Sequence, residues 1–127
     1  MKNRDYQQVK EYEKPTKMTI MWKDIPQVEI LMTMPRPTVR KLVEEPSLNI
    51  IGRVYREGAT YKDLDEFMLT RVSDRTRVDI NEILKRYDLK DFNPYWMCRK
   101  SHGRKVTDFL WIRYNDEDLT YDDIKIW

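Results

Sequence analysis

The sequence predicts a small α+β domain, in which an antiparallel sheet packs against about three short helices. Two segments near the N-terminus and one near the C-terminus alternate apolar and polar residues, which is typical of strands with one buried face. Other segments between them carry apolar residues at helical spacing. The chain has 127 residues, which is enough for one modest core.

The strands are expected in four places along the chain. Residues 18–33 predict a hairpin, because "KMTIMW" and "QVEILMT" both alternate and only a short turn separates them. A third strand is expected near residues 48–55 and a fourth over residues 108–114, in "DFLWIRY". The charged residues 1–16 lack apolar periodicity and predict a flexible arm before a single domain over residues 17–127.

Helices are expected over residues 62–71, 77–87 and 94–101, and a shorter one over residues 38–45 between prolines. In the short helix, Val39, Leu42 and Val43 would face the core. The helix boundaries rest on capping patterns, namely Thr60-x-x-Asp63, Thr76-x-x-Asp79 and Thr120-x-x-Asp123 at N-termini, Asn93-Pro94 before residues 94–101, and Gly103 after them.

The composition limits the classes of protein that the chain can belong to. Apolar residues make up 40% and charged residues 36%, a mixture typical of a folded domain with a polar surface. No apolar run approaches the roughly 18–20 residues of a membrane span, and no apolar segment follows the N-terminal charges as in a secretory signal. With one cysteine, Cys98, no internal disulfide can form, so a cytoplasmic location is expected.

The side chains that carry chemistry are sparse. One histidine and one cysteine cannot supply a zinc site, and the three glycines stand too far apart for a phosphate loop, so we expect no metal and no cofactor. Cys98 and His102, four residues apart, are the only candidate pair of thiol nucleophile and base. Structural roles, as a buried cysteine and as a surface or capping histidine, account for both residues equally well. We therefore expect no enzymatic activity.

The net charge of +2 conceals segments of opposite sign. Residues 99–105 are basic without an acid, whereas residues 116–123 hold five acids and no base. Basic clusters bind polyanions through the release of counterions, and Tyr95, Trp96 and Trp111 would offer stacking faces for bases. A nucleic-acid-binding regulator is therefore one alternative function, with Arg71, Arg75, Arg77, Arg99, Lys100, Arg104 and Lys105 as its contacts.

Two stretches, "LDEFMLTRVSDRTRVDINEILKRYDL" and "SHGRKVTDFLWIRYNDEDLTYDDI", resemble the module that precedes the kinase domain in some HipA-like proteins of Firmicutes. The resemblance rests on spaced patterns, whose matching positions are Arg71, Arg77, Ile80, Ile83, Leu84, His102, Gly103, Asp108, Trp111, Ile112 and residues 119–124. The 127 residues hold no counterpart of the ATP site of those kinases. The resemblance therefore implies a free-standing accessory module from a toxin–antitoxin-like operon, a phage or another mobile element.

The first functional hypothesis is accordingly a non-enzymatic module that binds and modulates another protein, either a HipA-like toxin kinase or a host or defence protein. Aromatic and arginine side chains dominate protein interfaces, and the candidate contacts of that kind are Tyr95, Trp96, Arg99, Arg104, Lys105 and Trp127. Trp96 fits the core equally well.

Two further interpretations remain open. The first concerns four residues that we expect to form a structural clasp around the turn after residue 103, namely Arg71, Arg77, Asp108 and Trp111. The second is that residues 116–123 mimic nucleic acid and block a guided nuclease, as in an anti-CRISPR-like phage inhibitor. The positive net charge of the chain counts against the second interpretation.

Overall fold

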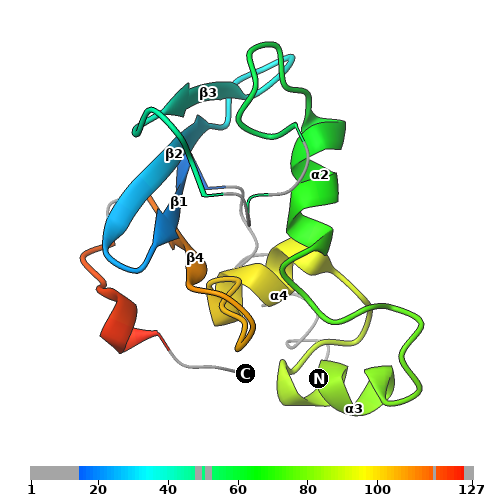
Figure 1. The fold of residues 1–127 in the computed structure, drawn as a ribbon. Coiled ribbons are helices and arrows are strands. Elements are labelled where there is room, and N and C mark those ends of the chain that lie inside the picture. Colours follow the sequence, from blue (N-terminus) through cyan, green and yellow to red (C-terminus); the bar gives the residue numbers. More distant parts are fainter. Residues whose placement is uncertain (1–14, 48–49, 51–52, 116, 125–127) are drawn as a thin grey trace.

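A computed structural model describes residues 15–47, 50, 53–115 and 117–124 of the chain. It confirms the expected α+β class, because a four-stranded antiparallel sheet packs against three helices (Figure 1). The strands are β1 (Lys17–Trp22), β2 (Ile25–Leu31), β3 (Thr38–Lys41) and β4 (Leu110–Tyr114), and their order in the sheet is β3-β2-β1-β4. The expected arm over residues 1–16 lies almost entirely outside the described residues.

The helices are α2 (Tyr61–Leu69), α3 (Ile80–Arg86) and α4 (Pro94–Ser101), and a 3-10 turn, η1 (Tyr121–Asp123), follows β4. The capping box at Thr60 and the N-cap at Asn93 are present as expected. The expected cap at Thr76 is wrong, because its hydroxyl donates to Asp74 and α3 begins after Asp79 without a side-chain cap. Helix α4 ends at Ser101, and its C-cap residue, His102, takes a left-handed φ of 57° just before Gly103.

Two clusters of buried side chains lie on opposite faces of the sheet. The larger one joins Ile20 and Ile112 of the sheet to Phe67 of α2 and Met97 of α4. The smaller cluster contains Met21, Trp111 and Ile124. In Figure 1, α2 and α4 accordingly lie to one side of the sheet and η1 to the other. Successive residues of a strand point to opposite faces, which explains why Trp111 and Ile112 belong to different clusters.

The expected helix over residues 38–45 is wrong. Thr38 to Lys41 form β3 and pair with Leu31 to Val28 of β2, while Leu42 is exposed and Val43 is only half-buried. Pairing with an existing strand satisfies the backbone of a short segment better than one isolated helical turn does, because helix nucleation is costly.

The strand expected near residues 48–55 is not observed at residues 50 and 53–55, which are the residues of this segment that the structure describes. Residues 48–49 and 51–52 lie outside the described residues. Ile50 donates its amide to the carbonyl of Ser47, and Arg56 donates to Arg53, so the described neighbours form turns. Ile50 and Val54 are nevertheless buried, and this burial explains the apolar pattern that suggested a strand.

The outer edge of β4 is closed by the segment between α4 and β4 and by the segment after β4. The amides of Leu110 and Tyr114 donate to the carboxylates of Asp108 and Glu117, at 3.1 and 2.8 Å. The amide of Ile112, between them, donates to the carbonyl of His102 at 2.7 Å. These bonds protect an edge that would otherwise be open to pairing with another strand. They also hold residues 102–108 against the sheet.

Candidate binding cleft

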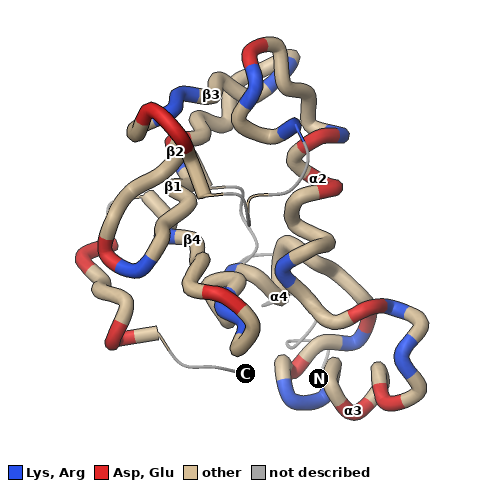
Figure 2. Tube along the Cα trace, in the orientation of Figure 1, with Lys and Arg blue, Asp and Glu red and all other residues tan. Residues whose placement is uncertain are grey.

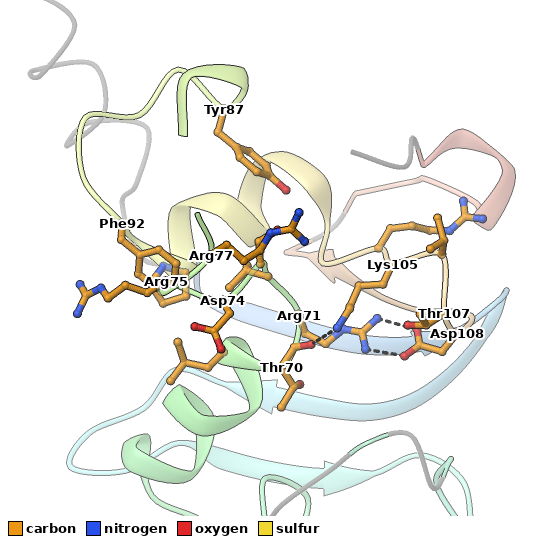
Figure 3. Close-up of a pocket in the computed structure, with 16 residues that line it drawn as sticks. Thr70, Arg71, Asp74, Arg75, Arg77, Tyr87, Phe92, Lys105, Thr107 and Asp108 are labelled. Atoms are coloured by element: carbon orange, nitrogen blue, oxygen red, sulfur yellow. Dashed lines mark hydrogen bonds and ion pairs between the residues drawn. The ribbon is translucent and has the colours of Figure 1, made fainter. Parts of the chain in front are cut away.

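An arginine at the end of α2 and an aspartate before β4 form a buried ion pair at the base of a cleft (Figure 3). Arg71 donates two hydrogen bonds of 2.8 Å to the carboxylate oxygens of Asp108. Two further N–H groups donate to the carbonyls of Gly103, at 3.0 Å, and Leu110, at 3.1 Å. The two side chains are 2% and 9% exposed, so the pair is well shielded from solvent. Because four of the five N–H donors of Arg71 form these hydrogen bonds, its role here is structural.

The pair ties three segments of the chain together. Burial raises the pKa of Asp108, but hydrogen bonds and charge from Arg71, the amide of Leu110 and the charge of Lys105 outweigh it and lower the pKa overall. Gly103, with φ +65°, lies so close that an added Cβ would stand 3.3 Å from the Cβ of Arg71. A side chain at position 103 would therefore crowd the pair.

Above the ion pair lies an open cleft of about 1140 Å³. Its lining consists of residues 69–75 and Arg77 at the α2–α3 connection, residues 104–108 before β4, and Tyr87, Phe92 and Pro94. The fold therefore brings together two basic segments that are separated by about 30 residues of sequence. Leu69, Phe92 and Val106 were not among the site residues expected from the sequence. Leu69 ends α2, Phe92 is half-buried against the core, and Val106 is exposed in a loop, so no shared pattern marks them as one surface.

The expected cationic residues take different positions around this cleft. Arg75 lies over the ring of Phe92, 4.9 Å from its centroid, and Lys105 donates to the carbonyl of Thr70 at 3.0 Å. Arg77 forms an exposed ion pair with Asp79 at 2.8 Å, so it does not belong to the clasp with Asp108. Figure 3 shows Arg75 and Arg77 at the α2–α3 side and Lys105 entering from the segment after α4.

The remaining basic residues are bound to other parts of the domain. Arg104 lines the cleft but donates to the carbonyl of Ile124 and to the hydroxyl of Tyr121, at 2.9 and 2.8 Å, which fastens η1 to the domain. Arg99 lies over the ring of Tyr114, and Lys100 donates to the carbonyl of Tyr87 at 2.6 Å. Five of the seven cations of the nucleic-acid hypothesis therefore line the cleft, whereas Arg99 and Lys100 do not.

The aromatic contacts expected for a protein interface do not form an exposed group. Trp96 is 3% exposed and belongs to the core, and Tyr95 packs against the core with its hydroxyl bonded to Asp65. Trp127 lies outside the described residues. Trp111, expected in the clasp, is buried on the opposite face of the sheet from Phe67 and donates its ring N–H to the carbonyl of Lys23 at 2.6 Å.

The pair Cys98 and His102 does not have the geometry of a nucleophile and its base. Cys98 is completely buried, its thiol faces the carbonyl of Met68 at 3.9 Å, and burial raises its pKa to about 12. The ring of His102 instead places Nε2 3.2 Å from both carboxylate oxygens of Glu117. A thiol with such a pKa is almost entirely protonated at neutral pH and is a poor nucleophile.

The acidic segment over residues 116–123 has local structural roles where it is described. Glu117 accepts from the amide of Tyr114, and the carboxylate of Asp123 accepts from the amide and hydroxyl of Thr120 at the start of η1. These backbone and hydroxyl bonds lower the pKa of Asp123. Figure 2 shows acidic and basic residues interspersed over much of the chain.

Within the described parts of the chain, no three His, Cys, Asp or Glu side chains are grouped as a metal site, and no helix is long and apolar enough to cross a membrane. Comparison with known proteins finds no matching family model, curated protein or solved structure.

Proposed function

We propose that the protein is a non-enzymatic module that binds another protein through the cleft between residues 69–77 and 104–108. The observation that supports this most strongly is the composition of the cleft, which combines arginine, aromatic and exposed apolar side chains in one concave surface. Those residue types are enriched where protein interfaces bury their centres. Val106 and Leu69 are 76% and 51% exposed at this surface, which leaves apolar area for a partner to cover.

The resemblance to the module that precedes the kinase domain in HipA-like proteins suggests the partners to test first. A kinase-like toxin is the first candidate, and a host or defence protein is the second. The bound module would modulate its partner by occupying a surface, because the residues of the cleft offer charge and shape but no activated nucleophile.

A nucleic acid is the alternative ligand, and the cleft favours it less. Bases bind single-strand proteins by stacking on exposed aromatic faces. Here Tyr87 is buried, and Arg75 covers one face of Phe92. The cleft therefore offers cations for phosphates but little aromatic surface for bases.

Replacing Val106 with aspartate should abolish capture of the partner, because it places a charge in the centre of the proposed apolar contact. The measurement is a pull-down from nuclease-treated host lysate with identification of the bound protein by mass spectrometry. Met34→Asp is the matched control, since Met34 is also 76% exposed but does not line the cleft.

The proposal requires one protein that the wild type and the Met34→Asp variant retain at equal yield and that the Val106→Asp variant loses. Equal loss in both variants, or equal retention in both, would exclude the cleft as the binding surface. Recovery that depends on intact nucleic acid would favour the alternative ligand.

A further inference from the structure

We infer that the segment bound in the cleft is acidic, with carboxylates placed near Arg75 and Lys105 and apolar side chains covering Leu69 and Val106. This inference rests on the proposed function, because it specifies the chemistry of the partner. It follows from the balance of charge in the cleft, from the cations that remain available there, and from the exposed apolar rim.

The lining of the cleft is positively charged. Five of its residues are cationic, namely Arg71, Arg75, Arg77, Arg104 and Lys105, and two are acidic, namely Asp74 and Asp108. The ion pair of Arg71 with Asp108 cancels internally and leaves four cations against one acid. Asp79, just outside the lining, neutralises Arg77. The remaining excess of positive charge attracts an anionic partner.

Arg75 and Lys105 are the cations best placed to contact such a partner. Among the described residues, neither forms an ion pair with a carboxylate. Lys105 gives one hydrogen bond to the carbonyl of Thr70, and an ammonium group has two further donors. The guanidinium carbon of Arg75 lies 4.9 Å from the centroid of the Phe92 ring. A guanidinium has five N–H donors, which can bind a carboxylate through two parallel hydrogen bonds.

The rim of the cleft indicates a polypeptide as the source of the anions. Leu69 and Val106 line the cleft, and Val78 beside Arg77 is completely exposed. Contact between these side chains and phosphates would bury apolar surface against charged oxygens, whereas an acidic amphipathic segment supplies apolar partners and carboxylates together. The negative charge of Asp74 also repels a continuous phosphate backbone more than a few spaced carboxylates.

The test compares two variants that each remove two positive charges. Arg75→Gln with Lys105→Gln changes the cleft, whereas Arg40→Gln with Lys41→Gln changes the exposed residues of β3, which do not line the cleft. The probes are fluorescein-labelled poly-L-glutamate and a labelled oligothymidylate with the same number of charges. Fluorescence anisotropy gives each affinity, and thermal melting followed by circular dichroism establishes that both variants fold.

The wild type should bind poly-L-glutamate, and the cleft variant should lose about tenfold in affinity, whereas the β3 variant should change less than about twofold. Equal losses in the two variants, or no binding of poly-L-glutamate, overturn the inference. Tighter binding of oligothymidylate that depends on Arg75 and Lys105 also overturns it, because it identifies nucleic acid as the ligand.

The pull-down separates this inference from the proposed function. If Val106→Asp abolishes capture of a protein and Arg75→Gln with Lys105→Gln leaves capture intact, the cleft binds a protein but not through an acidic segment. If both cleft variants reduce capture and the β3 variant does not, both proposals stand. If Val106→Asp retains capture, the proposed function itself fails.

Discussion

Replacing Asp108 with alanine should lower the free energy of unfolding by about 3–5 kcal/mol, since it leaves the charge of Arg71 buried without its partner. Arg71 would keep its bonds to the carbonyls of Gly103 and Leu110 but would lose both carboxylate bonds. Urea denaturation of the wild type and the variant at pH 7 measures the difference. A loss below about 1 kcal/mol would show that solvent reaches the pair.

The difference in the free energy of unfolding between the wild type and Asp108→Ala should also depend on pH, and the sign follows from the pKa of Asp108. The pKa of Asp108 is lowered in the folded protein, so the unfolded state takes up a proton first as the pH falls. The stability from the pair is complete above the unfolded pKa of roughly 3.9 and is lost as the pH falls through the lower folded pKa. The gap in stability between the wild type and Asp108→Ala should therefore narrow below about pH 4.

Arg77 provides the control for the buried pair. Its ion pair with Asp79 has side chains that are 53% and 47% exposed. Arg77→Ala should therefore change the free energy of unfolding by less than about 1 kcal/mol, because exposed ion pairs contribute little. A loss of several kcal/mol in the free energy of unfolding of Arg77→Ala would show that Arg77 belongs to the clasp.

Replacing Trp111 with alanine should cost about 3–5 kcal/mol, because it removes the largest side chain of the smaller cluster. Trp111 is completely buried, and it packs with Met21 and Ile124 on the face of the sheet opposite the helices. The loss would weaken the packing of η1 on the sheet and would also leave the carbonyl of Lys23 without the indole N–H. Thermal and urea denaturation measure the change.

Two substitutions separate the contributions of Trp111. Trp111→Phe retains much of the apolar volume and loses the hydrogen bond, so its cost should be smaller, about 1–3 kcal/mol. Phe109→Ala should cost less than Trp111→Ala because Phe109 is partly exposed. If Trp111→Ala cost no more than Phe109→Ala, the smaller cluster would not be a core.

The sequence predicts the fold class and most elements because their signals are local. Alternation in β2 and the apolar stripe of α2 each reflect one buried face, whereas β1 and β4 are apolar strands buried on both faces. Strand β3 has four residues between prolines, which are too few for a period to show. The start of α3 is also late, because Arg77 and Asp79 bond to each other within the preceding turn.

The site was only partly predictable. Arg71 continues the apolar stripe of the helix expected over residues 62–71, which is a signal for a buried charge with a partner. In the structure it follows α2, and Asp108 is that partner. Arg104 and Lys105 line the cleft and Arg99 and Lys100 do not, and the left-handed backbone of His102 and Gly103 lies between these two pairs. That turn directs the chain in three dimensions, and composition alone does not reveal it.

The measurement that tests the central claim most directly is a ¹H–¹⁵N correlation spectrum of the labelled protein during titration with the captured partner or with poly-L-glutamate. The account predicts that the largest shifts occur in residues 69–77 and 104–108, which line the cleft. Shifts concentrated in β3 or over the face of η1, with the cleft unchanged, would contradict it.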